Sequence, residues 1–437
     1  MRGLSRATKR CQNPAMRWTV KLAAAALAAL LQACATAPAP APVPVAVEVK
    51  PPVTILVSID GFRADYLARG VTPNLSRLAA EGVSAPMRPS FPSKTFPNHW
   101  TLVTGLRPDR HGITANKIED PARPGETFIM TTDDPFWWNA AMPLWVDAEK
   151  AGIRTGTMFW PGSNVAMGGT RASEWPNAIA GGTRPADWAQ FNMAIDSTQR
   201  VNGVLDWLRR PAAIRPRFVT LYFDTVDTAG HAFGPDDPRT TAAVAEIDGH
   251  IGDLVAGLAE LDQPANLVIV ADHGMAATSS SRTIVLSQLL PAGSYRSVET
   301  GPYASLFALP GHEAEVEKAL LGNHDHYSCW RKSEIPERFH YGSNPRIPPI
   351  FCLAQVGSQF AEKPPTSRRA GGNHGWDNMA PEMAALFVAN GPAFRTGTLP
   401  PFDNVDVYPL LRDLIGLPPK PGVDGSDAVF KDVMTAP

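Results

Sequence analysis

Three short apolar runs, each closed by an acidic residue, constrain the fold of this chain more than any other feature. They span residues 53–59, 217–223 and 266–271 and are rich in β-branched, aromatic and leucine side chains. Continuous apolar strands of this kind are buried on both faces, as in a mainly parallel sheet covered by helices. We therefore expect an α/β fold built on a mainly parallel sheet.

Helical periodicity follows the strands. It is found in three segments, residues 72–81, 188–208 and 242–261, and another helix is expected to begin near Asn98. The alternation of strands and helices predicts one layered α/β domain over residues 53–420. Residues 296–365 differ, because they hold two cysteines, several prolines and an aromatic-rich stretch. We interpret them as a cap subdomain inserted into the main fold.

Residues 1–33 have the composition of an export signal. They hold six basic residues, no acidic residue and an apolar run over residues 22–31 that is too short to cross a bilayer. The ending Leu31-Gln32-Ala33-Cys34 resembles the bacterial lipobox, although ordinary cleavage with an unmodified Cys34 is an alternative. Residues 34–52 contain six prolines and predict an extended tether. We expect an exported, periplasmic lipoprotein whose membrane contact is the lipid on Cys34.

Charge and cysteine content limit the partners and the redox state. The chain has 40 Lys and Arg residues against 42 Asp and Glu residues, so no nucleic-acid duplex is expected as a partner. The part predicted to fold holds two cysteines, Cys329 and Cys352. An even pair in an exported protein predicts one disulfide, and two buried free thiols are the alternative.

Acidic residues or histidines follow each predicted strand. The set consists of Asp60 after the first, Asp227 and His231 after the second, Asp272 and His273 after the third, and His374 in a glycine-rich loop. Ligands of open α/β sheets bind at the carboxyl ends of the strands. Six nitrogen and oxygen ligands make two catalytic metal sites, and histidine with carboxylate favours zinc over magnesium or calcium. Two such ions about 3.5–4 Å apart can clamp the attacking and leaving oxygens of phosphoryl transfer.

Thr95 is the candidate nucleophile. It lies just ahead of the helix expected from Asn98, where a metal ion and the positive end of the helix stabilise an alkoxide. On spacing alone, a role for Thr95 as a cap or turn residue is favoured.

Six motifs occur in order along the chain, VSIDGFRADYL, KTFPNHWTLVTGLRPDRHGI, VDTAGHAFGP, VIVADHGM, HYGSNPRIPPI and GGNHGWDN. Together they resemble the nucleotide pyrophosphatase/phosphodiesterase family of the alkaline phosphatase superfamily, from about Pro52 to Leu417. The resemblance implies an alkaline-phosphatase-like α/β/α sandwich. It also implies a hydrolase that carries two zinc ions and cleaves nucleotide phosphodiester or pyrophosphate bonds.

The resemblance further implies a role for each candidate residue. The second zinc site consists of Asp60, Thr95, Asp272 and His273, and the first of Asp227, His231 and His374. Thr95 attacks phosphorus and forms a covalent phospho-threonine, which water then hydrolyses to release a nucleoside 5′-monophosphate. Asn116 donates a hydrogen bond to a phosphate oxygen, and its neutral amide suits a diester.

The substrate is less constrained than the metal site. By resemblance, Phe96 stacks on a nucleobase, and Trp175 is the candidate for the second aromatic wall. Lys94 either steers an anionic substrate or is simply solvated. A choline phospholipid or glycerophosphodiester phosphodiesterase with the same site is the close alternative, and a non-catalytic ligand-binding lipoprotein is the distant one. The oligomeric state stays open.

Overall fold

The computed structural model describes residues 49–172, 178–366 and 370–435. The predicted signal segment, the tether up to residue 48, Cys34 and Trp175 lie outside the described residues. All elements below belong to one compact unit, Lys50–Pro437.

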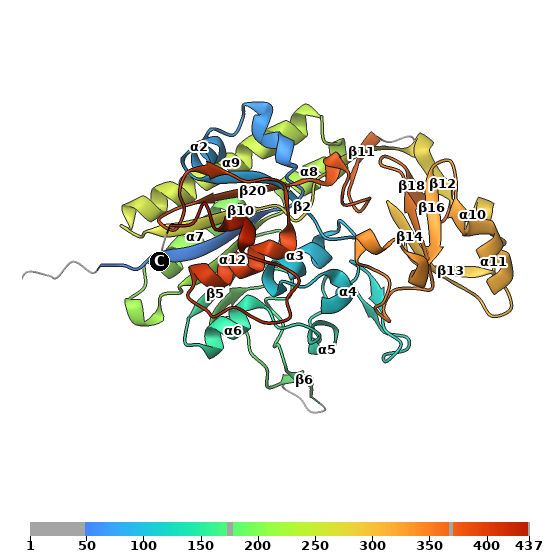
Figure 1. Cartoon of the computed structure of the whole chain (residues 1–437), viewed down its shortest axis with the longest axis horizontal. Coiled ribbons are helices and arrows are strands. Elements are labelled where there is room, and N and C mark those ends of the chain that lie inside the picture. Colours follow the sequence, from blue (N-terminus) through green and yellow to red (C-terminus); the bar gives the residue numbers. More distant parts are fainter. Residues whose placement is uncertain (1–48, 173–177, 367–369, 436–437) are drawn as a thin grey trace, which may run out of the picture. The chain divides into compact units, whose positions relative to one another are not determined.

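The central sheet is built around β1 (Val53–Ile59), which is buried along its whole length. β1 pairs in parallel with β9 (Phe218–Phe223) on one side and β10 (Ala265–Val270) on the other. All three predicted strands are therefore present within one residue of their predicted starts and ends. They are also neighbours in the sheet (Figure 1).

The remaining strands extend this sheet in both directions. Beyond β9 come β5 (Thr155–Met158) and β8 (Asp187–Ala189), both parallel. Beyond β10, β20 (Ala385–Asn390) runs antiparallel and pairs with β2 (Val83–Arg88). The predicted α/β fold with a mainly parallel sheet is confirmed.

Helices cover the sheet in two groups (Figure 1). One group packs α2 (Pro73–Glu81) and α7 (Ser197–Leu208) against α9 (Pro238–Glu260). The other packs α3 (Thr95–Thr104) against α12 (Val407–Leu414).

The predicted helix over residues 188–208 is wrong in its first half. Asp187–Ala189 is strand β8, and α7 begins at Ser197. Asp196 caps that helix, because its side chain accepts from the Gln199 backbone while the Gln199 side chain accepts from the Asp196 backbone.

A second, antiparallel sheet is formed by residues between Tyr295 and Ala354. Its strand order is β13 (Tyr295–Glu299), β14 (Tyr303–Ala308), β17 (Ile350–Ala354), β16 (Tyr327–Arg331) and β15 (Gly322–Asn323). We call it the cap sheet. Cys329 of β16 and Cys352 of β17 lie opposite each other and form the predicted disulfide.

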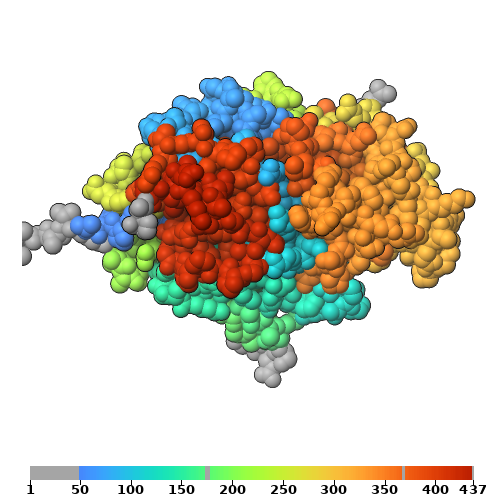
Figure 2. All heavy atoms as spheres, viewed as in Figure 1, coloured from blue at the N-terminus to red at the C-terminus, as the bar shows by residue number. Residues whose placement is uncertain are grey.

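Arg346, in the segment between the cap strands β16 and β17, binds to the α/β body. Its buried guanidinium donates to the carbonyl oxygens of Gly112 and Trp137, at 2.9 and 2.6 Å, and to the Asp120 carboxylate at 2.6 Å. In Figure 2 the cyan part of the chain, with α3 and α4 (Pro108–His111), lies between the inserted residues in orange and the C-terminal residues in red.

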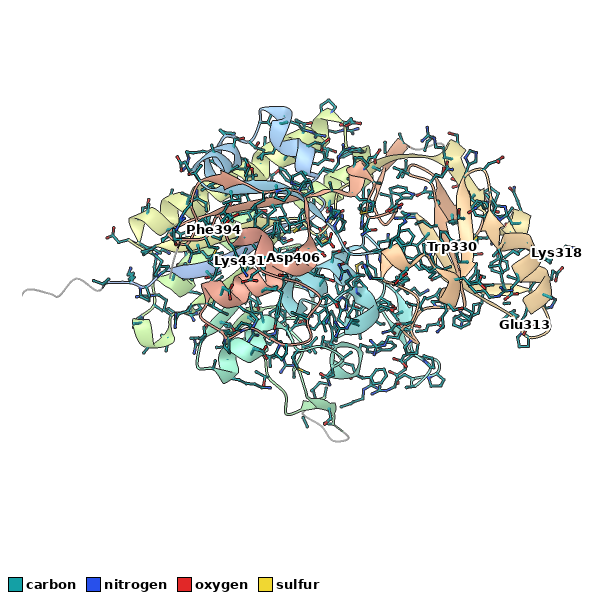
Figure 3. The ribbon with its side chains drawn as sticks, in the orientation of Figure 1. Glu313, Lys318, Trp330, Phe394, Asp406 and Lys431 are labelled. Atoms are coloured by element: carbon teal, nitrogen blue, oxygen red, sulfur yellow. A yellow bond between two sulfur atoms is a disulfide. The ribbon has the colours of Figure 1, made fainter. Side chains whose placement is uncertain are left out.

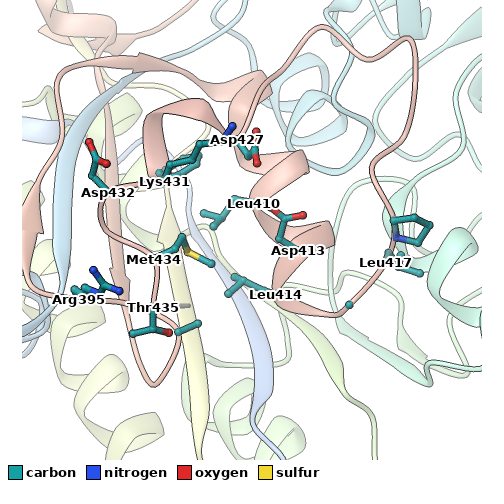
Figure 4. Close-up of a pocket in the computed structure, with 14 residues that line it drawn as sticks. Arg395, Leu410, Asp413, Leu414, Leu417, Asp427, Lys431, Asp432, Met434 and Thr435 are labelled. Carbon is teal, nitrogen blue, oxygen red and sulfur yellow. The ribbon is translucent and has the colours of Figure 1, made fainter. Parts of the chain in front are cut away.

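The C-terminal residues enclose a groove of about 990 Å³ against α12 (Figure 4). Its lining includes Leu410, Leu414 and Met434 with charged side chains at the rim, and none of the predicted site residues. No helix among the described residues is long and apolar enough to cross a membrane.

Asp406, labelled in Figure 3, gives the stability of the C-terminal region a pH dependence. Burial, reinforced by the charge of Asp403, raises the pKa of Asp406 to about 6. The folded state therefore binds this proton more tightly than the unfolded chain, whose aspartate pKa is about 3.9. Stability from this group is present below pH ~4 and is lost as the pH rises through 6.

We expect Asp406→Asn to raise the melting temperature at pH 8 and to leave it nearly unchanged at pH 4. The asparagine oxygen can still accept the hydrogen bond from the Ser426 N–H, 2.8 Å in this structure. Thermal denaturation at the two pH values measures the effect, and an equal change at both would contradict the assignment.

Candidate active site

The carboxyl ends of β1, β9 and β10 bring the predicted acidic residues together. Asp60 directly follows β1, Asp272 follows β10, and Asp227 lies in the first turn of α8 (Thr225–Phe233), just after β9. Gly61 allows the close approach of these segments. It has φ +69°, its N–H donates to Asp272 Oδ1, and a Cβ there would lie 3.0 Å from Asp227.

Three histidines present the same ring nitrogen to the site. The Nδ1 atoms of His231, His273 and His374 lie 2.9 Å from the backbone carbonyl oxygens of Gly372, Gly274 and Ser93. A carbonyl can only accept, so each Nδ1 carries the proton and donates it. The other ring nitrogen, Nε2, then faces the site, as in histidines that bind metals.

Two of these Nε2 atoms face each other. His231 Nε2 and His374 Nε2 are 3.1 Å apart, a distance at which two acceptors repel unless a cation lies between or beside them. The Asp227 carboxylate adds oxygens 3.4 Å from His231 Nε2 and 3.7 Å from His374 Nε2. These three residues form the first predicted ligand set.

The second predicted set converges on His273. Its Nε2 lies 2.9 Å from Asp272 Oδ2, 3.5 Å from Asp60 Oδ1 and 3.2 Å from the Thr95 hydroxyl. The rings of His273 and His374 stack with centroids 3.5 Å apart, so the two sets are adjacent. The structure thus brings together all seven residues predicted as metal ligands.

The site carries more buried negative charge than the chain itself compensates. Burial, followed by the charges of Asp272 and Asp227, raises the pKa of the Asp60 carboxyl well above its usual range. Asp60 Oδ1 and Asp227 Oδ1 are buried without a hydrogen-bond partner. Orphaned carboxylate oxygens beside imidazole lone pairs are the donor set that divalent zinc requires, so the residues fit two such ions.

Two further residues position the ligands. The Tyr222 hydroxyl donates to Asp60 Oδ2 at 2.7 Å. His99 Nδ1 donates to the Thr95 carbonyl oxygen at 2.9 Å and lies 3.4 Å from Asp272 Oδ2, while its Nε2 contacts the Ser58 hydroxyl. Tyr222 was not predicted, because a tyrosine inside an apolar strand carries no local signal for such a contact.

Thr95 is the first residue of α3, three positions before the predicted start of this helix. Its hydroxyl therefore lies at the positive end of the helix as well as beside His273. Asn116 accepts a hydrogen bond from the Phe96 N–H at 3.0 Å through its side-chain oxygen. This contact fixes the amide orientation and keeps the NH₂ group as a donor.

A cavity of about 500 Å³ opens onto these residues. It is lined by Thr95, Asn116, Asp60, Asp227, His231 and His374, and by the aromatic side chains of Phe96 and Phe191. Phe191 is 46% exposed and was not predicted, because it lies in the segment expected to be helical. Trp175, the predicted second aromatic wall, lies outside the described residues. Phe191 provides an aromatic surface on the wall of this cavity.

Comparison with known proteins defines the class of this site. The sequence profile of the family "Type I phosphodiesterase / nucleotide pyrophosphatase" matches residues 54–377. An uncharacterised pyrophosphatase/phosphodiesterase of Schizosaccharomyces pombe is 36% identical over 84% of this chain and 77% of its own length. The bis(5′-adenosyl)-triphosphatase enpp4 of Xenopus laevis is 38% identical over 85% of this chain and 79% of its own.

A solved structure agrees with these sequence relatives. An inactive threonine-to-alanine variant of murine ectonucleotide pyrophosphatase/phosphodiesterase 5, in complex with AMP, superposes with a TM-score of 0.81 and 32% identity. The match covers 88% of this chain and 100% of the other. The protein is a hydrolase with the alkaline-phosphatase-like fold, and it carries candidate ligand groups for the metal ions on which its family depends. It belongs to the nucleotide pyrophosphatase/phosphodiesterase family.

Removal of bound metal should destabilise the protein, because the buried carboxylates then lose the cations that compensate them. We expect chelator to lower the melting temperature by several degrees and added zinc to restore it. His374→Ala should lose most of this zinc response. His312→Ala, a change at a histidine of the cap region whose side chain is 44% exposed, should keep it. Thermal denaturation with and without zinc measures both, and a full zinc response in His374→Ala would contradict the ligand assignment.

Proposed function

We propose that this protein is a two-zinc phosphodiesterase and pyrophosphatase that releases nucleoside 5′-monophosphates through a covalent intermediate on Thr95. The observation that carries this proposal is the 3.1 Å approach of the His231 and His374 lone pairs beside the orphaned oxygen of Asp227. When bound, the two zinc ions supply positive charge to the phosphoryl group and lower the pKa of coordinated hydroxyl groups.

Side chains of the protein supply the nucleophile and bind the phosphoryl group. Thr95 provides the attacking hydroxyl, held at the helix end and 3.2 Å from His273 Nε2. Its Oγ forms the new bond to phosphorus while the bond to the leaving-group oxygen breaks. The Asn116 NH₂ group donates to a non-bridging phosphate oxygen, since its own oxygen is engaged by the Phe96 N–H. Water then cleaves the phospho-threonine and regenerates Thr95.

The cavity wall favours a nucleotide over a choline headgroup. A quaternary ammonium group requires free aromatic faces and an unpaired acid. Here the Arg200 guanidinium lies 5.0 and 5.6 Å from the ring centroids of Phe159 and Phe191, and it pairs with Asp224 at 2.7 Å. This cation neutralises the acid and opposes a second positive charge. A nucleobase meets no such penalty on the exposed part of Phe191.

Relatives add support for the substrate class. The name of the Xenopus relative describes a bis(5′-adenosyl)-triphosphatase, and the murine structure holds AMP in a variant that has lost a threonine and is inactive. We extend the same substrate class to this chain. We also propose that residues 1–33 export the protein and that a lipid on Cys34 holds it in the periplasm, which cell fractionation and labelling with a fatty acid test.

The full-length protein should cleave the p-nitrophenyl ester of thymidine 5′-monophosphate far faster than p-nitrophenyl phosphorylcholine. Chelator should abolish the reaction and zinc should restore it. A preference for the choline ester would keep the metal site but move the function to lipid headgroups. Inactivity on both esters after zinc loading would indicate a ligand-binding role.

Thr95→Ala should lose at least ~10³-fold in kcat while it keeps bound zinc, because the nucleophile is absent and most ligands remain. Thr95→Ser retains a hydroxyl and should keep measurable turnover. Metal analysis alongside steady-state kinetics separates loss of the nucleophile from loss of the metal, and near-normal turnover of Thr95→Ala would remove Thr95 from the mechanism.

Phe191→Ala should raise KM for the thymidylate ester by about tenfold, with a smaller effect on a methyl p-nitrophenyl phosphate that has no base to stack. Trp188→Ala provides the matched control, since Trp188 is also exposed but does not line the cavity. Equal effects of Phe191→Ala on both substrates would exclude base stacking.

A further inference from the structure

Residues 340–346, which we call the return loop, carry a sequence motif that the mechanism above does not use. The loop has the sequence HYGSNPR and lies between the cap strands β16 and β17. None of its residues, all of which the structure describes, lines the active-site cavity. The loop instead hydrogen-bonds to residues 109–120, the part of the chain that carries Asn116.

One guanidinium group ties both ends of residues 112–120, which we call the Asn116 loop. Arg346 donates to the Gly112 carbonyl oxygen at 2.9 Å and to the Asp120 carboxylate at 2.6 Å. These partners lie four positions before and four positions after Asn116. Gly112 has φ +81°, and a Cβ there would lie 3.0 Å from Arg346 Nη1, so glycine allows this close approach.

Tyr341 holds the Asn116 loop nearer to its centre. Its buried hydroxyl donates to the Thr114 carbonyl oxygen at 3.1 Å, two positions before Asn116. The Tyr341 ring packs edge-on against Phe91 and Phe351, with ring centroids 5.4 and 5.5 Å away. Because Phe351 belongs to β17, packing against the cap sheet fixes the place of this hydroxyl.

Asp109 holds the return loop itself. Its carboxylate accepts from the backbone N–H groups of Gly342, Ser343 and Asn344 at 3.1, 3.0 and 3.0 Å. The Asn344 side chain donates back to the Asp109 carbonyl oxygen at 2.8 Å. Hydrogen bonds to an ionised carboxylate are among the stronger ones in proteins, so the return loop is a firm support for Tyr341 and Arg346.

Regular secondary structure does not fix Asn116. Residues 112–117, all described, contain no helix or strand, and β3 (Ile118–Glu119) is only two residues long. The Phe96 N–H orients the end of the Asn116 side chain but not the backbone that carries it. A group that binds a reacting phosphoryl oxygen has to be held within about 0.5 Å of its productive position. The backbone beneath Asn116 therefore needs support of its own.

We propose that Tyr341 and Arg346 are positioning residues for Asn116, so that the return loop shapes the phosphate-binding site without contacting the substrate. This inference rests on the proposed function, in which the Asn116 NH₂ group donates to a non-bridging phosphate oxygen. Loss of either contact moves this amide and leaves Thr95 and the metal ligands in place. Negative charge gathers on the non-bridging oxygens in the transition state, so the loss appears in kcat more than in KM.

Tyr341→Phe removes one hydroxyl and keeps the ring in its aromatic cluster. We expect kcat for the p-nitrophenyl ester of thymidine 5′-monophosphate to fall about 10-fold, with KM and bound zinc within about twofold of wild type. Tyr408→Phe is the matched control, because Tyr408 is a buried tyrosine of α12 whose hydroxyl donates to Asp147 at 3.3 Å. Its kcat should stay within about twofold of wild type when both variants are assayed well below their melting temperatures.

A double-mutant cycle with Asn116→Ala separates positioning from a general structural effect. In the Asn116→Ala background, the loss caused by Tyr341→Phe should shrink from about 10-fold to less than about twofold, because the group that it positions is absent. Arg346→Lys keeps the charge but cannot bind Gly112 and Asp120 with one planar group, and its loss should shrink in the same way. Tyr341→Phe carries the test if Arg346→Lys does not fold.

Stereoselectivity provides an independent readout. In the two diastereomers of thymidine 5′-(p-nitrophenyl phosphorothioate), sulfur replaces one or the other non-bridging oxygen, and Asn116 donates to only one of these positions. The ratio of kcat/KM for the two diastereomers in Tyr341→Phe should therefore shift from the wild-type value toward the value of Asn116→Ala. A change that only destabilises the fold leaves this ratio unaltered.

Equal losses from Tyr341→Phe with and without Asn116, or an unaltered diastereomer ratio, would overturn the proposal, because the hydroxyl would then serve the fold alone. An unchanged kcat in Tyr341→Phe would overturn it as well. A normal kcat in Asn116→Ala would instead contradict the phosphate-binding role of Asn116 in the proposed function, on which the inference rests.

Discussion

The concentration of negative charge and lone pairs at one edge of the sheet is the constraint on which the rest of the structure depends. Carboxylate oxygens of Asp60, Asp227 and Asp272 lie 2.9–3.7 Å from the Nε2 atoms of three histidines, His231, His273 and His374. Within the described part of the chain, no Lys or Arg forms an ion pair with these carboxylates, and divalent cations at the site would compensate their charge. The parallel order of β10, β1 and β9 makes the arrangement possible, because it aligns three carboxyl ends.

The backbone carbonyls that hold the histidines are as important as the ligands. In His231, His273 and His374, Nδ1 donates its proton to a backbone carbonyl oxygen. This hydrogen bond fixes the tautomer and the orientation of each ring. With Nδ1 as the hydrogen-bond donor, Nε2 can donate its lone pair to a metal ion and does not serve as a hydrogen-bond donor to the other ligands. The side chains of Lys94, Thr95 and Asn116 line the cavity beside these ligands.

The strands and the metal ligands could be predicted because their signals are local. β1 is a run of apolar residues that ends at Asp60, and the ligands follow their strands within a few positions. The roles of Phe191 and Tyr222 could not be predicted from the sequence, because they arise from packing against distant segments. The start of α7 was missed because apolar residues of β8 mimic helical spacing, and only the Asp196 cap marks the boundary. The burial of Lys94 depends on Gly375 and Tyr303, both over 200 positions away.

The cap sheet separates His273 from His374 along the chain, and this has a consequence for synthesis and folding. The ligands span residues 60 to 374, so a ribosome must deliver nearly the whole domain, disulfide loop included, before the last one is available. A partial chain has β1, β9 and β10 but an incomplete set of donors. Under the proposed function, metal binding is therefore a late event, and contacts of such long sequence separation make folding slow. A complete ligand set therefore forms only after His374 has been synthesised.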